Sequence, residues 1–341
     1  MKAAVIGLTV GERHAVDYLS NTHVQEVVLC DINQEKMDSV GDKLGIAKRY
    51  TDYTQMLQIE RPDIVSVCVS NFLHKQICLD AFRAGSDVLC EKPLARNAQE
   101  AEEIATVAKR CNRKLMVNFN RRYRPEARAL KQLIEADALG DIYYATTSWK
   151  RARGVPWWYP LDHAKEKIGG GAFIDLGVHM LDLCLWLMDY PEPDYVHGKT
   201  FRKLSTAEAK ERGFENFDAE DMCVATVSMK QDIILLTEIS WASNVEWEEQ
   251  LELRLYGTKG GAVIRGQAEH CDEAILIINE KGQPKITPIV SIEDGWNVRD
   301  AFVDAVIHNT EVPCTPQQAI TVASIMDAVY RSSETAAPSK V

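Results

Sequence analysis

Short apolar runs alternate with helical patterns over the first third of the chain. Five runs are typical of strands: Ala3 to Ile6, Val24 to Leu29, Ile64 to Val69, Asp87 to Leu89 and Leu115 to Asn118. The segments between them place apolar residues at helical spacing, as in His14 to Ser20, Gln34 to Leu44 and His74 to Ala84. Gly45 and Gly85 are expected to end two of these helices. This alternation predicts an α/β domain with a doubly wound parallel sheet over residues 1–120.

From about Ile142 the pattern changes to strands of alternating polar and apolar residues. The expected strands are Tyr143 to Trp149, Val196 to Lys203, Met222 to Met229, Ile233 to Trp241, Gln250 to Tyr256, Gly261 to Ile264 and Ala274 to Ile278. Turn residues such as Gly257 to Gly261 separate them, which predicts an open, mainly antiparallel sheet. One helix, Ala172 to Met188, interrupts the set. We therefore expect a second α/β domain over residues 121–341.

Two further helices are predicted near the C-terminus, over Val298 to Asn309 and Pro316 to Ser333. We expect them to pack back on the first domain. The last residues, Ala336 to Val341, have the composition of a disordered tail.

Size and charge limit the function. With 341 residues the chain is long enough for two domains that each bury a core. The formal net charge of -11 argues against nucleic-acid and anionic-membrane partners, because phosphate binding needs a basic surface. The 9 cysteines are scattered without a CxxC pair, as expected for reduced thiols in the cytoplasm. The N-terminal apolar run is too short for a signal peptide, and no stretch is long enough to span a bilayer.

The first strand leads into Gly7-Leu8-Thr9-Val10-Gly11, where a dinucleotide-binding turn brings the backbone close to a pyrophosphate. Gly7 and Gly11 fit this pattern, but Thr9 stands where a glycine usually contacts the phosphates. The loop alone therefore leaves a plain strand-to-helix turn equally open. Asp31 ends the second strand, where an acid bonds the ribose 2′-hydroxyl and repels a 2′-phosphate. We predict NAD, with NADP less favoured; a plain turn aspartate is the alternative.

Lys92 follows the apolar strand Asp87-Val88-Leu89-Cys90, where a parallel sheet places its ligand crevice. An ammonium group there can bond a substrate hydroxyl and stabilise a developing alkoxide. Glu91 would anchor it and Pro93 would stiffen the turn. The alternative is a solvated lysine beside a turn proline.

The helix after Gly169-Gly170-Gly171 carries Asp175, His179 and Asp182 on one face. An imidazole can exchange protons near neutral pH, and a carboxylate can hold its tautomer. A structural aspartate–histidine pair is the alternative. We expect no metal, because no third ligand with suitable spacing lies nearby.

An aromatic and basic segment, Trp149 to Tyr159, precedes this helix, and its flat rings suit the C–H faces of sugars. The alternative is a subunit contact. The segment Asn118 to Arg122, just past the fifth strand, offers amide and guanidinium donors to a ligand. The alternative is that these residues cap a helix and carry surface charge.

Together these residues resemble the Gfo/Idh/MocA oxidoreductases, the family of glucose-fructose oxidoreductase and inositol dehydrogenase. The motifs that carry the resemblance are Gly7 to His14, Glu91 to Pro93, Asn118 to Tyr123, Gly169 to Gly171 and Asp175 to Asp182. The resemblance covers nearly the whole chain. It implies an N-terminal Rossmann domain beside an α/β domain whose open sheet forms homodimers or homotetramers.

By this resemblance Lys92, Asp175 and His179 match the catalytic lysine, aspartate and histidine of the family. Thr9 departs from the family glycine, so a bond from its hydroxyl to a phosphate and weaker nucleotide binding both stay open. The residues expected to bind the cofactor are Gly7, Thr9, Val10, Gly11, Asp31, Ser70, Asn71, His74, Glu91 and Lys92. The residues expected to bind substrate are Lys92, Asn120, Arg121, Arg122, Lys150, Arg153, Trp157, Trp158, Asp175 and His179.

The implied function is oxidation of a ring secondary alcohol of a sugar, glycoside or cyclitol by NAD, with carbon 3 of a glycoside as one candidate position. Two other functions stay open. One is a redox cycle on bound NAD that cleaves glycosidic bonds. The other is a sugar sensor, which we rank last because both the lysine and the histidine are present.

Overall fold

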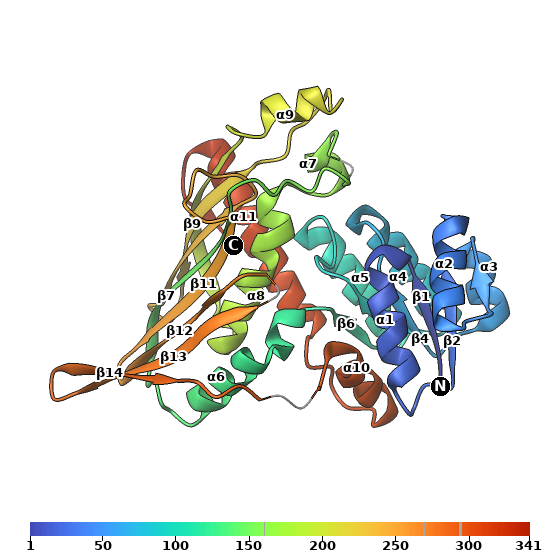
Figure 1. The fold of residues 1–341 in the computed structure, drawn as a ribbon, viewed down its shortest axis with the longest axis horizontal. Coiled ribbons are helices and arrows are strands. Elements are labelled where there is room, and N and C mark those ends of the chain that lie inside the picture. The colour runs from blue at the N-terminus through green and yellow to red at the C-terminus, as the bar shows by residue number, and fades with distance from the viewer. Residues whose placement is uncertain (160, 269, 293–294) are drawn as a thin grey trace. The chain divides into compact units, whose positions relative to one another are not determined.

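The computed structural model describes residues 1–159, 161–268, 270–292 and 295–341, which divide into two compact units (Figure 1). The first unit is Met1–Phe119 with Gly295–Ile320, and the second is Asn120–Asp294 with Thr321–Val341. None of the described helices is both long and apolar enough to cross a membrane.

The first unit is built on a six-stranded parallel sheet with the strand order β3-β2-β1-β4-β5-β6. Its strands are β1 Lys2–Ile6, β2 Glu26–Cys30, β3 Arg49–Tyr50, β4 Ile64–Val67, β5 Asp87–Cys90 and β6 Leu115–Val117. This order is the one that places a dinucleotide across the point where the winding reverses. The predicted doubly wound sheet is therefore confirmed.

Helices flank this sheet on both sides. They are α1 Leu8–Ser20, α2 Gln34–Leu44, α3 Tyr53–Glu60, α4 His74–Ala84, α5 Ala98–Arg110 and α10 Val298–Ile307. Helix α1 contacts α2 and α10, and α4 contacts α3 and α5. Gly45 and Gly85 end α2 and α4 in the left-handed conformation, as predicted, because only glycine adopts it without a steric penalty.

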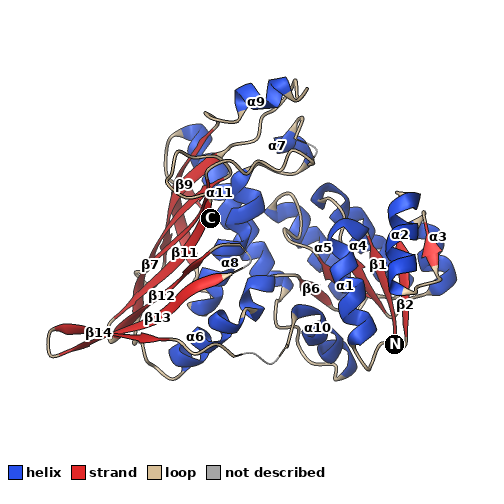
Figure 2. Cartoon of the chain, viewed as in Figure 1, coloured by secondary structure: helices blue, strands red, loops and turns tan. Residues whose placement is uncertain are grey.

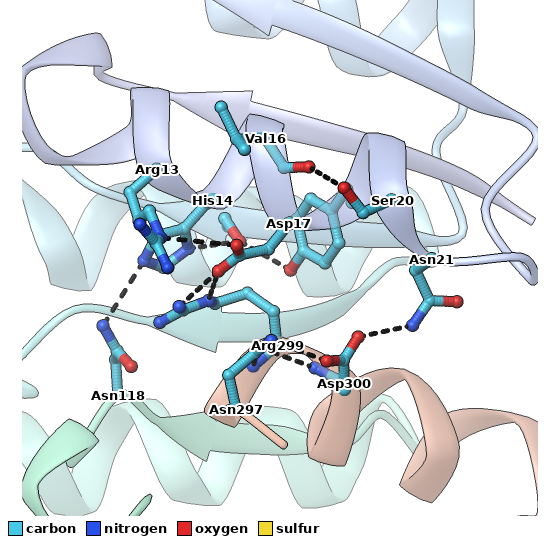
Figure 3. Close-up of polar contacts among 12 residues, drawn as sticks. Arg13, His14, Val16, Asp17, Ser20, Asn21, Asn118, Asn297, Arg299 and Asp300 are labelled. Atoms are coloured by element: carbon cyan, nitrogen blue, oxygen red, sulfur yellow. Dashed lines mark hydrogen bonds and ion pairs between the residues drawn. The ribbon is translucent and has the colours of Figure 1, made fainter. Parts of the chain in front are cut away.

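One buried ion pair and one half-buried hydrogen bond fix the late helix α10 to α1 (Figure 3). The Arg299 guanidinium donates to Asp17 through Nε at 2.8 Å, and both side chains are 9% exposed. Asn21 Nδ2 donates to Asp300 Oδ1 at 2.7 Å. A segment almost 300 positions from α1 in the sequence thus completes the first unit.

The second unit is built on a nine-stranded sheet with the order β14-β13-β12-β11-β7-β10-β9-β8-β15. Its strands are β7 Ile142–Arg151, β8 Pro193–Phe201, β9 Met222–Met229, β10 Ile234–Ser240, β11 Glu249–Gly257, β12 Gly260–Gly266, β13 Cys271–Glu280, β14 Gln283–Pro288 and β15 Ser339–Lys340. Among the described strands of this second sheet, only β7 and β10 pair in parallel. The predicted open, mainly antiparallel sheet is confirmed.

One face of this sheet is covered by helices and the other is open (Figure 2). Strands β7, β9 and β10 alternate buried and half-exposed residues. The covering helices include α6 Pro125–Glu135, α8 Val178–Leu187 and α11 Pro316–Thr335. The shorter helices α7 Ala164–Lys167 and α9 Thr206–Glu211 lie in connections. The buried face forms the core of the unit and carries α8.

The expectation of a disordered C-terminal tail is wrong. Ser339 and Lys340 form β15, which pairs antiparallel with Val196 and Tyr195 of β8. The free backbone groups of an edge strand can bind a short polar segment that has no hydrophobic pattern of its own. From Thr321 onward α11 also belongs to the second unit, where Ser332 Oγ accepts a hydrogen bond from Gly198 N of β8 at 3.0 Å.

Candidate active site

The turn from β1 to α1 brings backbone into close contact at its glycines. Gly7 has φ 89°, and a Cβ there would lie 2.5 Å from the carbonyl oxygen of Cys68. A Cβ on Gly11 would lie 2.6 Å from Val5 Cγ1, so Gly11 allows α1 to pack against its strand. Helix α1 begins directly after Gly7, at Leu8. Leu8 N donates to Asp31, and the other first-turn amides, which have no partner within the helix, can receive an anionic group. This turn therefore fits a dinucleotide phosphate.

Thr9 lies in that first turn and is exposed. Its Oγ1 accepts a hydrogen bond from Lys36 Nζ at 2.7 Å. Thr9 departs from the glycine pattern, and its hydroxyl is therefore already bound to the ammonium group of a lysine on α2. Val10 beside it is 47% exposed.

Asp31 makes the turn contact that the sequence left open, and a second contact to the first helix. Its Oδ1 accepts from Asn33 N at 2.8 Å, which is the turn contact. Its Oδ2 accepts from Leu8 N at 2.7 Å, so the carboxylate also lies at the N-terminus of α1. Since each carboxylate oxygen has a further lone pair, Asp31 can still accept from ribose hydroxyls.

Lys92 follows Glu91 directly after β5, and a cis peptide bond joins it to Pro93. The Glu91 carboxylate accepts from Lys92 N at 3.2 Å and from His14 Nε2 at 3.1 Å. It also accepts a hydrogen bond from Asn118 Nδ2, and Asn118 in turn contacts His14 (Figure 3). Burial would raise the pKa of Glu91, but His14, Asn118 and the charge of Lys92 hold it below its ordinary value. Glu91 is thus a buried anion that fixes the backbone on which Lys92 stands.

His14 links this anion to the sheet. Its Nδ1 lies 3.0 Å from Ser66 Oγ, which lies 2.7 Å from the hydroxyl of Tyr18. A neutral His14 satisfies the chain if Tyr18 donates to Ser66, Ser66 donates to His14, and His14 donates to Glu91. The ligand atoms of His14, Cys68 and Glu91 lie within 4.8 Å of one another. Both ring nitrogens of His14 have hydrogen-bond partners, Ser66 at Nδ1 and Glu91 at Nε2. Hydrogen bonding therefore explains why these residues cluster, and we propose no metal.

The remaining cofactor candidates follow β4. Ser70 is half-buried, whereas Asn71 and His74 are buried. Both ring nitrogens of His74 lie 2.9 Å from carbonyl oxygens, those of Pro93 and Val69. Burial lowers the pKa of His74. His74 therefore braces the turn after Lys92, and we leave it out of the proposed cofactor contacts.

In the second unit the predicted helix over 172–188 has two parts. Phe173–Gly177 forms a π-helical turn that runs directly into α8. Such turns are rare and often mark functional sites. Asp175 lies in the π turn, and His179 lies in the first turn of α8 with 9% exposure.

Trp241 and Trp149 contact the two ionisable residues. Trp241 Nε1 donates to Asp175 Oδ2 at 3.0 Å and is itself fully buried. The ring of Trp149 lies 5.8 Å from that of His179, tilted by 44°. The guanidinium of Arg121 lies 4.5 Å from the Trp149 ring centre. These contacts place a carboxylate, an imidazole and an aromatic–cation pair in one region of the second unit.

Arg122 is placed differently from Arg121. Its guanidinium forms a bidentate pair with Asp182, with Nε 2.9 Å from Oδ2. Side-chain exposure is 3% for Arg122 and 1% for Asp182, and the Tyr190 hydroxyl donates to Asp182 at 2.6 Å. This pair ties the segment before α6 to α8. We therefore leave Arg122 out of the proposed substrate contacts. Asn120, two residues earlier, is exposed and stays a candidate.

The aromatic and basic segment is held mainly by strand contacts. Lys150 Nζ pairs with Glu238 at 2.5 Å, and Arg153 donates to the Ser243 carbonyl oxygen at 3.1 Å. Trp157 packs on Phe214 and Phe217 at ring distances of 5.8 and 6.0 Å. Trp158 is 73% exposed. Trp158 is therefore the ring of this segment that solvent reaches most.

Sequence reasoning missed several residues of these clusters, among them Trp241, His14 and Tyr190. Trp241 and Tyr190 carry no local signal, because their partners are far along the chain or on another turn. His14 lies within the first motif. Its place on a helix that packs against the sheet was the only sign in the sequence that it could belong to the site.

Comparisons with known proteins agree with this arrangement. The chain matches the model of an oxidoreductase family with an NAD-binding Rossmann fold over residues 1–119, and that of its C-terminal alpha/beta domain over residues 131–341. The chain belongs to the Gfo/Idh/MocA oxidoreductase family. The first unit is thus an NAD-binding domain and the protein an oxidoreductase of this family.

Several relatives are named dehydrogenases. The D-glucoside 3-dehydrogenase of Escherichia coli K12 is 27% identical over 98% of this chain and 96% of its own length. The myo-inositol 2-dehydrogenase of Thermotoga maritima is 27% identical over 55% of each chain. Levoglucosan dehydrogenase, solved with NADH, superposes with a TM-score of 0.85 at 19% identity, covering 100% of this chain and 99% of that one. At that identity the structural likeness shows the fold alone.

Proposed function

We propose that this protein oxidises a ring secondary alcohol of a sugar, glycoside or cyclitol, with NAD as the hydride acceptor. Carbon 3 of a glycoside is the position to test first, because a D-glucoside 3-dehydrogenase is similar over 98% of this chain. The observation that carries the proposal is the buried polar support of Lys92 and Asp175. Glu91 and His14 underpin Lys92, and Trp241 holds Asp175.

NAD would lie on the N-terminal turn of α1, with the ribose at Asp31. A Cβ at Gly7 would meet the Cys68 carbonyl oxygen, so glycine keeps this turn tight, and the first-turn amides after Leu8 fit a pyrophosphate. Gly11 would contribute through packing, and Thr9, Val10, Ser70 and the Lys92 turn would lie beside the dinucleotide. When bound, NAD supplies the electrophilic carbon that takes up hydride. Asp31 favours a free ribose 2′-hydroxyl and so NAD over NADP.

The residues of the chain would handle the substrate oxygen and its proton. Lys92 would donate a hydrogen bond to the reacting hydroxyl and stabilise negative charge as it develops. His179 would accept the hydroxyl proton. Asp175, held by Trp241, would keep the imidazole oriented and favour its protonated form after transfer.

The ring of the substrate would lie against aromatic and polar side chains of the second unit. Trp158 and Arg121 are candidates for these contacts, together with Asn120, Lys150, Arg153 and Trp157. Aromatic faces bind the C–H faces of sugars, and the amide and guanidinium groups bond hydroxyls.

A panel of methyl glucosides, free sugars and inositols with NAD or NADP, followed by absorbance of the reduced cofactor, tests the proposal. Lys92→Ala and His179→Ala should each lower turnover about 100-fold or more on the best substrate, because each loses a proton-handling group. Arg61→Ala, on an exposed helix end in the first unit, is a control that should leave turnover unchanged. Full turnover by Lys92→Ala would refute its role. Release of free aglycone without NADH would favour glycosidic cleavage instead.

We also propose self-association through the open face of the nine-stranded sheet. Leu236 is 37% exposed there, and the rings of Tyr144 and Tyr256 lie 5.0 Å apart on neighbouring strands. Apolar and aromatic groups on one open sheet face favour an isologous contact. Light scattering should give a dimer or tetramer, and a monomer would contradict this.

A cytoplasmic location is proposed from the thiols. All 9 cysteines are free and 7 of them are buried. Titration of the unfolded protein, purified without reductant, should yield nine free thiols.

A further inference from the structure

Glu220 is a buried carboxyl group that the proposed reaction does not use. It precedes β9 and is 4% exposed. Its Oε1 accepts hydrogen bonds from Phe173 N at 2.9 Å and from the Tyr330 hydroxyl at 3.0 Å. Its backbone oxygen accepts from Ala172 N at 3.0 Å. Three hydrogen bonds thus join Glu220 to its surroundings, and two of them go to the first turn of the helix that carries Asp175 and His179.

Two of the three glycines before this helix, Gly170 and Gly171, are explained by the same contacts. A Cβ on Gly171 would lie 2.2 Å from the Glu220 carbonyl oxygen, and one on Gly170 would lie 2.0 Å from the Tyr330 hydroxyl. Phe173 and Tyr330 also pack edge to face, with ring centres 6.1 Å apart. The glycines therefore let Glu220 and Tyr330 approach the start of the helix.

The carboxyl group has no charged partner among these contacts. Phe173 N and the Tyr330 hydroxyl are neutral donors, and Oε2 has no hydrogen-bond partner among the described residues. The ionised form therefore buries a charge, stabilised by the positive end of the helix. The protonated form instead buries a hydroxyl donor without an acceptor. Neither form is fully satisfied.

We propose that Glu220 is a positioning residue for the proposed oxidation: its carboxyl group holds the first turn of the helix that carries Asp175 and His179, and its charge sets how firmly. This inference rests on the proposed function. An ionised acceptor binds the Phe173 amide and the Tyr330 hydroxyl more strongly than a neutral one. The turn is accordingly held most firmly when Glu220 is ionised.

The titration of Glu220 falls in the neutral range. Burial raises its pKa to about 7, and the bonds from Phe173 N and Tyr330 oppose the rise. The titratable groups that interact with it are Tyr330 on α11 and Cys223 on β9. Burial raises both pKa values well above their ordinary range, so both stay neutral while Glu220 titrates. The next residue, Asp221, turns its carboxylate to the amides of residues 203–205.

Two effects of opposite direction follow as the pH rises from about 5.5 to 8. Because the folded pKa lies above the unfolded one, the folded state binds more protons and is destabilised by the rise. The first helical turn becomes more firmly held over the same range. Glu220→Gln keeps the acceptor oxygen and removes the charge, so both pH dependences should disappear.

The test compares the wild-type protein with Glu220→Gln by thermal unfolding and by amide hydrogen exchange of the 172–178 segment at pH 6 and 8. After correction for intrinsic rates, the segment should exchange about tenfold more slowly in the wild type than in Glu220→Gln at pH 8. At pH 6 the two proteins should exchange at similar rates. Between pH 6 and 8 the folding equilibrium constant of the wild type should fall about tenfold more than that of the variant, because the folded pKa of about 7 lies between the two values. Equal pH dependence in both proteins would overturn the proposal.

A matched control and a second variant complete the test. Glu60→Gln is the control. Burial would raise the pKa of the Glu60 carboxyl group, but hydrogen bonds from Lys2, Lys48 and Tyr50 lower it to about 2. Glu60 therefore does not titrate between pH 5.5 and 8, and the variant should keep the pH dependence of the wild type. If Glu220→Gln does not fold, Tyr330→Phe removes one donor and should move the stability change to higher pH. An unmoved profile in Tyr330→Phe would also overturn the proposal.

Activity then separates positioning from titration. The kcat of the wild type should be about ten times that of Glu220→Gln at pH 8, and the ratio of the two kcat values should be much smaller at pH 6. The KM for NAD should be the same in both proteins. An unchanged kcat ratio would refute the positioning role. If the wild type oxidises no sugar or cyclitol, the proposed function fails, whereas the exchange and unfolding data still decide the role of Glu220 in holding the turn.

Discussion

The Arg122–Asp182 pair should be the strongest single polar support of the helix that carries His179. Asp182 lies on α8, and its side chain is 1% exposed. It accepts from two nitrogens of Arg122 and from the Tyr190 hydroxyl. Burial raises the pKa of Asp182, and Arg122 and Tyr190 oppose that rise. In Asp182→Asn one carboxylate oxygen becomes an amide donor facing a guanidinium donor, and Arg122 stays buried without a counter-charge.

Removing one partner of a buried ion pair costs about 3–5 kcal/mol, because the other charge stays in a low dielectric. For a unit of this size, 1 kcal/mol corresponds to about 2–4 °C in Tm. Asp182→Asn should therefore lower the Tm by about 6–20 °C in calorimetry at pH 7.5. Replacing both partners, as Arg122→Met with Asp182→Leu, should recover most of that loss, since no unpaired charge is left.

Asp189→Asn is the matched control. Asp189 also pairs with a lysine from α6, Lys131, but its side chain is 78% exposed. It has φ 59°, a conformation that asparagine tolerates well. Solvent screens Asp189, and Lys131, which is 10% exposed, keeps the Trp186 carbonyl oxygen as an acceptor. The loss should therefore be about 1 kcal/mol, well below that of Asp182→Asn. Equal losses in Asp182→Asn and Asp189→Asn would refute the assignment of Asp182 to a buried structural pair.

Two further predictions concern the two halves of the proposed site. Gly7→Ala should weaken NADH binding at least tenfold in a fluorescence titration, because its Cβ would meet the Cys68 carbonyl oxygen at 2.5 Å. Gly85→Ala has a similar φ of 95° but no neighbour within 4 Å, so it should lose stability without a change in Kd. Trp241→Phe removes the donor to Asp175 and should lower kcat about tenfold while the KM for NAD is unchanged. A full kcat in Trp241→Phe would show that Asp175 needs no such support.

Local sequence patterns predicted the main architecture of this protein, but not the strands β3, β14 and β15. Strand and helix periodicity reflect which side chains meet the core, and this information is repeated at many positions. The pattern therefore predicted the parallel sheet of the first unit, the open sheet of the second, and the glycine ends of α2 and α4. Motif spacing likewise identified Lys92, Asp175 and His179 as candidates, because the end of a strand and one face of a helix are local properties.

Tertiary structure decided which polar groups hold others in place. Arg121 and Arg122 are adjacent, yet Arg121 lies over Trp149 while Arg122 is buried against Asp182. Glu220 and Tyr330 meet the triple glycine from distant parts of the sequence, and the polar tail segment pairs with β8. Such contacts depend on burial and on single long-range hydrogen bonds. A periodic pattern cannot encode them, because each involves one residue whose partner is set only when the chain has folded.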